Sequence, residues 1–105
     1  MNIFKTLFAV AMLTTMTAFS ASLAPVACLK NAPAGMPIND IIKLCSGAAT
    51  LYPVGCYKTI IRQVSSDSAI RLCAGALSMA PISCFNEAVQ LVTPENATEL
   101  CRGAN

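Results

Sequence analysis

The sequence contains no histidine and no tryptophan, and only 11% of its residues are charged. Histidine is the most frequent general base and the centre of Ser-His-Asp triads, so its absence removes most familiar catalytic arrangements. The acidic residues stand singly along the chain and do not form the carboxylate pair of a hydrolase; they are Asp40, Asp67, Glu87, Glu95 and Glu99. We therefore expect a protein that is not an enzyme and that uses no cofactor.

Clustered positive charge is also lacking. From Ala21 onward six Lys and Arg residues stand against five Asp and Glu residues, which gives a net charge of +1. Binding to nucleic acid requires a basic face or stripe. This balance therefore argues against a nucleic-acid partner.

The first 22 residues have the pattern of a secretory signal peptide. A short basic start with Lys5 leads into an apolar stretch, and small residues follow at Ser20 to Ser22. We expect cleavage near residues 20–22 and a mature domain over residues 23–105. A membrane anchor is disfavoured because the apolar stretch is shorter than a spanning helix needs and no basic stop follows it. A lipid-attached Cys28 is disfavoured because Pro25 stands where a lipoprotein signal has Leu.

All six cysteines belong to a frame that repeats every 28 residues. Each unit begins with Pro-x-x-Cys and, sixteen residues later, ends with Leu-Cys-x-Gly-Ala; the units are residues 25–48, 53–76 and 81–104. Six cysteines in a small exported chain indicate three disulfides. A metal site or a redox-active pair is disfavoured, because the chain has neither Cys-x-x-Cys nor histidine.

Two disulfide connectivities respect the period of the repeat. The first closes each unit on itself through Cys28–Cys45, Cys56–Cys73 and Cys84–Cys101. The second joins neighbouring units through Cys45–Cys56 and Cys73–Cys84 and leaves Cys28 with Cys101. We favour the first, because the second requires the two ends of the array to meet.

The hydrophobic spacing predicts that each unit is a helical hairpin. In unit two, Pro53 suits the first turn of a helix, and Ser65 to Asp67 provide a turn with capping residues. The apolar positions at helical spacing are Cys56, Ile60, Ile61 and Val64 on the first helix and Ala69, Ile70, Leu72 and Cys73 on the second. Gly75 either ends the second helix or allows another backbone to come close.

Units one and three follow the same pattern with some changes. In unit three we expect Ala88, Val89 and Val92 to face inward on the first helix and Ala97, Leu100 and Cys101 on the second. In unit one, Pro33, Gly35 and Pro37 interrupt the first helix. Asn39 and Asp40 can cap the second. A terminal repeat that departs from the pattern is expected to be a cap.

The predicted fold is therefore all-α: three disulfide-linked hairpins form a small α-solenoid or a compact six-helix array. Leu29, Tyr57 and Phe85 occupy equivalent positions just after the first cysteine of each unit. They either pack between units or form a shallow exposed row, and we favour packing.

The frame Leu-Cys-x-Gly-Ala followed by Pro-Val/Ile-x-Cys resembles repeats in small exported bacterial proteins of unknown role. The resemblance covers the whole predicted mature chain. It implies a repeat module at a secreted or periplasmic location and implies no catalytic residue.

Two classes of function remain. The first is a non-catalytic binding or structural module whose partner is an extracytoplasmic protein, peptide or surface ligand. The second is a secreted effector, such as a protease inhibitor or a toxin-like or antimicrobial protein. Low net charge disfavours a membrane-disrupting peptide, and Lys58 and Arg71 fall on predicted helices rather than on an inhibitory loop.

Overall fold

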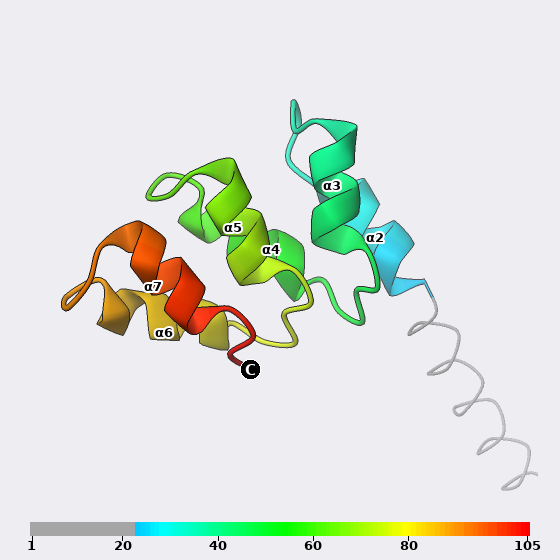
Figure 1. The fold of residues 1–105 in the computed structure, drawn as a ribbon. Coiled ribbons are helices and arrows are strands. Elements are labelled where there is room, and N and C mark those ends of the chain that lie inside the picture. Colours follow the sequence, from blue (N-terminus) through cyan, green and yellow to red (C-terminus); the bar gives the residue numbers. More distant parts are fainter. Residues whose placement is uncertain (1–22) are drawn as a thin grey trace, which may run out of the picture.

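The computed structural model describes residues 23–105, a range that contains six helices and no strand (Figure 1). The helices are α2 (Ala24–Asn31), α3 (Ile38–Cys45), α4 (Tyr52–Ile60), α5 (Ser66–Cys73), α6 (Ala80–Ala88) and α7 (Pro94–Cys101). The predicted all-α class is confirmed. The predicted signal peptide, residues 1–22, lies outside the described residues.

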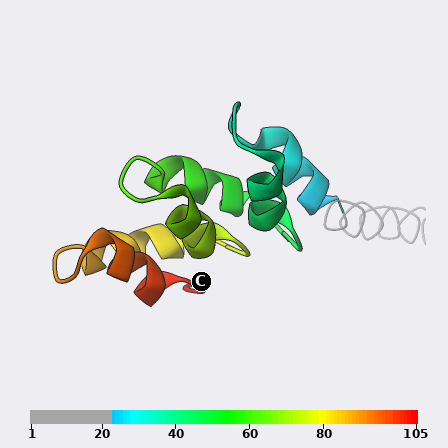
Figure 2. The ribbon, with the colours of Figure 1, turned by 45° about the horizontal axis from the view of Figure 1, so that its top comes forward.

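The six helices form three hairpins that follow one another in chain order. Helices α2 and α3, α4 and α5, and α6 and α7 pack in pairs. The first helix of each hairpin contacts the first helix of the next, and the second helices do the same. Figures 1 and 2 show the hairpins side by side, each beside its neighbour in the sequence. This nearest-neighbour arrangement is that of a short repeat array.

Proline and hydroxyl caps set where the helices begin. Proline occupies one of the first two positions of α2, α4, α6 and α7, where its missing N–H is not needed. The side chains of Ser65 and Thr93 cap α5 and α7 by accepting hydrogen bonds from the N–H groups of Ser68 and Asn96.

The predicted cap of α3 by Asn39 and Asp40 is wrong. The carbonyl of Pro37 already accepts hydrogen bonds from the N–H groups of Asp40 and Ile41, so the helix begins at Ile38 with Pro37 as its N-cap residue. Asp40 lies in the first turn instead, where its negative charge interacts favourably with the positive end of the helix dipole.

A type II β-turn follows the second helix of each unit. In unit two, Ala74 has φ −59° and ψ 131°, Gly75 has φ +75°, and the Ala76 N–H donates to the Cys73 carbonyl at 3.1 Å. Type II turns require positive φ at this third position. A Cβ added at Gly75 would meet no atom within 4 Å, so backbone conformation rather than close approach explains the glycine. The same turn occurs at residues 45–48 and 101–104.

Each hairpin is closed by its own disulfide. Cys28–Cys45, Cys56–Cys73 and Cys84–Cys101 are bonded, with Cα atoms 5.5 to 5.6 Å apart. This is the within-unit pairing that we favour from the repeat. Each bridge joins the first helix of a unit to the last residue of its second helix.

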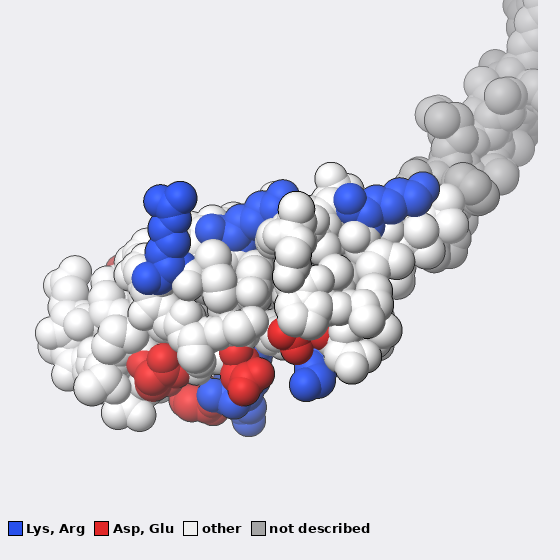
Figure 3. All heavy atoms as spheres, turned by 90° about the horizontal axis from the view of Figure 1, so that it is seen from above, with Lys and Arg blue, Asp and Glu red and all other residues white. Residues whose placement is uncertain are grey.

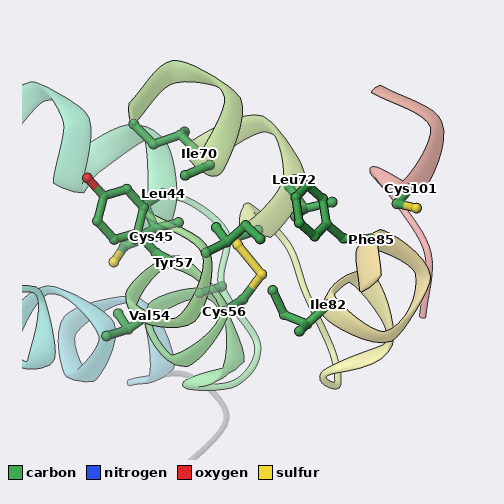
Figure 4. Packing of buried hydrophobic residues seen from close by; sticks show 14 of the residues in the cluster. Leu44, Cys45, Val54, Cys56, Tyr57, Ile70, Leu72, Ile82, Phe85 and Cys101 are labelled. Atoms are coloured by element: carbon green, nitrogen blue, oxygen red, sulfur yellow. A yellow bond between two sulfur atoms is a disulfide. The ribbon is translucent and has the colours of Figure 1, made fainter. Parts of the chain in front are cut away.

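One hydrophobic core runs through all three hairpins (Figure 4). Most of the predicted inward positions are buried, and Ile61 and Val64 pack against the core although α4 ends at Ile60. The prediction for Leu100 is wrong, because its exposed fraction is 69%. Val92 is also exposed. Both residues belong to unit three, beside which the described residues place no further hairpin.

Removing the central bridge tests how far the fold depends on the disulfides. We expect Cys56→Ala with Cys73→Ala to lower the free energy of unfolding by about 3 kcal/mol, because the loop that it closes is no longer constrained in the unfolded chain. Urea titration followed by circular dichroism measures the change. The control is Ser83→Ala, at an exposed position of α6, which should leave the midpoint nearly unchanged. Equal midpoints for the bridged and unbridged proteins would contradict the expectation.

Candidate functional site

The repeat allows each surface position to be compared with its equivalents 28 residues away. Three positions per unit, at the same spacing in each, differ in exposure between unit one and the other two units, and we call them the leading positions. In units two and three they are buried; they are Val54, Tyr57 and Ile70 in unit two, and Ile82, Phe85 and Thr98 in unit three.

The same positions are exposed in unit one. Val26 is 48% exposed, Leu29 43% and Ile42 55%, because no described hairpin precedes α2 and α3. The expectation that the residue after the first cysteine packs between units is therefore right for Tyr57 and Phe85 and wrong for Leu29. Three apolar side chains that would be buried elsewhere in the array face outward here.

These side chains line a shallow apolar hollow with a volume of about 240 Å³. We call this surface the leading face; its lining residues are Pro25, Val26, Leu29, Ile41, Ile42, Cys45 and Ser46. No charged residue belongs to the lining. Such a surface favours apolar contact over the binding of a charged small molecule.

The opposite end of the array has a matching feature. Leu44 and Leu72 are fully buried, whereas the equivalent Leu100 is exposed. In Figure 4, Leu44 of unit one points towards Tyr57 of unit two, and Leu72 of unit two points towards Phe85 of unit three. We call this leucine the trailing leucine of each unit. It packs on the leading aromatic residue that follows it, and in unit three it has nothing to pack on.

A second apolar hollow, of about 270 Å³, lies at the side of the array. It is lined by Leu51, Tyr52, Gly55 and Met79, so it spans the start of α4 and the residue before α6. This hollow lies between neighbouring hairpins within the chain and not at an end.

Several polar contacts join unit two to unit three near their second helices. Arg71 of α5 pairs with Glu99 of α7 at 2.7 Å between Nε and Oε1. Glu95 accepts hydrogen bonds from the Ser65 N–H and the Ser68 hydroxyl. Figure 3 shows only Lys and Arg side chains along one edge of the molecule, and Asp and Glu together with further Lys and Arg side chains along the opposite edge. Opposite charges therefore join unit three to unit two.

The described residues hold no group of three His, Cys, Asp or Glu side chains that could bind a metal ion. The cysteines that the repeat singles out are brought together in pairs, as disulfides. Over residues 23–105, every helix is too short or too polar to cross a membrane.

No protein-family model, curated protein or solved structure matches the chain. The internal repeat is therefore the available comparison. The repeat could also have indicated the leading face, because positions that pack between hairpins in the later units have no described hairpin before them in unit one. The exposure of Val26 and Ile42 was not predicted from the repeat, whereas an exposed row that includes Leu29 was one of the two alternatives.

The trailing leucines provide a matched pair of substitutions. We expect Leu72→Ala to lower the free energy of unfolding by roughly 2–5 kcal/mol, because it opens a cavity between two hairpins. The equivalent Leu100→Ala should change it by less than about 0.5 kcal/mol, since that side chain is exposed. Urea denaturation of both variants beside the wild type measures the difference. Similar losses at the two positions would contradict the assignment of Leu100 to an uncovered end.

Proposed function

We propose that the protein is a non-catalytic binding or structural module that works outside the cytoplasm and contacts a protein or peptide partner through its leading face. The observation that carries the proposal is the exposure of Val26, Leu29 and Ile42. Their equivalents in units two and three, each of which has a hairpin before it, are buried. An apolar surface of this kind commonly marks a protein contact.

The disulfides support an oxidising location. All six cysteines are bonded, and structural disulfides persist in secreted and periplasmic proteins but are rare in the cytoplasm. The predicted signal peptide over residues 1–22 favours the same location. Together these features favour a secreted or periplasmic protein.

A secreted protease inhibitor is the alternative, and the structure supports it less. Inhibitors present a rigid extended loop to the protease, whereas Lys58 lies within α4 and Arg71 within α5. Arg71 is also engaged by Glu99. A toxin that disrupts membranes by positive charge is disfavoured by the net charge of +1 from Ala21 onward.

Photo-crosslinking in the producing cell tests the binding module. A photoreactive amino acid at Val26 should give a covalent adduct with another polypeptide after illumination. The same amino acid at Arg62, which is exposed in the turn after α4, should give little or none. Denaturing electrophoresis and mass spectrometry identify the adducts. Failure to trap any polypeptide from Val26 at any growth stage would count against the proposal.

A further inference from the structure

We infer that the partner of the leading face is the trailing end of a second copy of this chain, so that copies join head to tail and continue the array. This inference rests on the proposed function and names its partner. The interface that it requires is already present twice within the chain, between units one and two and between units two and three.

The apolar part of the joint follows from the repeat. Within the chain, trailing Leu44 meets Tyr57 and trailing Leu72 meets Phe85 (Figure 4). One step further along the array, Leu100 of one copy meets Leu29 of the next. Both side chains are exposed in the single chain and both are apolar. The joint would therefore bury the apolar surfaces at the two ends of the array, the leading face and the surface around Leu100.

The charges at the joint are complementary. Arg71 and Glu99 occupy equivalent positions in successive units and form an ion pair. Across a head-to-tail joint, Glu99 of one copy takes the place of Arg71, and Lys43 of the next copy takes the place of Glu99. The signs are reversed, but the pair remains one of opposite charge. At the junction of units one and two, by contrast, the same positions hold Lys43 and Arg71.

The polar contact of Glu95 also has a counterpart. Glu95 accepts from the Ser65 N–H and the Ser68 hydroxyl of the preceding hairpin. Across the joint, Asn39 takes the place of Glu95, and Thr93 and Asn96 take the places of the two serines. The Asn39 side-chain oxygen accepts a hydrogen bond just as a carboxylate does, so the joint can keep a polar contact there.

The resulting association is heterologous, because two different surfaces meet. Such contacts produce rings when the rotation closes and open filaments when it does not. They also make a specific prediction for mixtures of variants, because each copy uses one surface for one neighbour and the other surface for the next.

The test uses the protein as processed and exported by its host and two variants, Leu29→Asp and Leu100→Asp. Each should raise the dissociation constant for self-association by roughly tenfold or more, because a carboxylate is placed at the centre of the joint. An equal mixture should form a one-to-one complex that grows no further, since one variant retains an intact leading face and the other an intact trailing end. Sedimentation velocity measures all three samples.

Controls separate loss of association from loss of fold. Leu77→Asp, at a comparably exposed leucine in the connection between units two and three, should associate like the wild type. Circular dichroism and the mass of the oxidised protein check each variant. If Leu29→Asp does not fold, Ile42→Asp tests the same face from α3.

Several results would overturn the inference. If only one of Leu29→Asp and Leu100→Asp abolishes self-association, and the mixture forms no one-to-one complex, the protein forms a symmetric dimer instead. A wild-type protein that stays monomeric while Val26 crosslinks to a different polypeptide would refute self-association and leave the proposed function standing. A monomer with no crosslinked adduct would refute both.

Discussion

The Cys56–Cys73 bridge and its two equivalents hold the open end of each hairpin together, and the rest of the structure depends on them. The helices have only eight or nine residues, a length at which isolated helices are marginal in water. Many of the buried residues are Ala and Cys, which contribute little apolar area each. The covalent link fixes the spacing of the two helices and so places Leu72 and Tyr57 on opposite sides of one rigid unit.

The three units stack through equivalent helices at both junctions. Each hairpin presents leading residues to its predecessor and a trailing leucine to its successor, so a mutation in one interface has an equivalent in the other. The two ends of the array expose the same chemistry that the interior buries. The exposure of Leu29 and Leu100 is therefore a direct consequence of the repeat, and their apolar character is a property that the end units share with the middle one.

Much of this architecture could be predicted from the sequence because it depends on local spacing. The cysteine period predicts the units, the prolines and Ser65 predict helix starts, and the glycines mark the turns that end them. The failures concern residues whose environment depends on another unit. Leu100 has the local pattern of a buried leucine, and only the absence of a fourth described hairpin exposes it. The prediction of a cap at Asn39 was wrong because α3 begins earlier, at Ile38, where the Pro37 carbonyl accepts the first hydrogen bonds of the helix. The capping preference of the Asn39 side chain does not reveal where the backbone begins the helix.

The distribution of polar residues bears on why the ends remain apolar. Terminal repeats usually carry a polar outer face that keeps the array soluble. The prediction that Pro33, Gly35 and Pro37 interrupt the first helix of unit one is wrong, because α2 runs unbroken over Ala24–Asn31 and these residues lie in the turn after it. Unit one keeps apolar residues on its outer face. Polarity enters instead at a buried junction, where Thr98 replaces the Ile of the other units and donates to the Glu95 carbonyl at 2.6 Å. An interior junction therefore accommodates a hydroxyl, whereas the outer faces of units one and three keep Leu29 and Leu100 exposed. This is the distribution that our proposal of head-to-tail association requires.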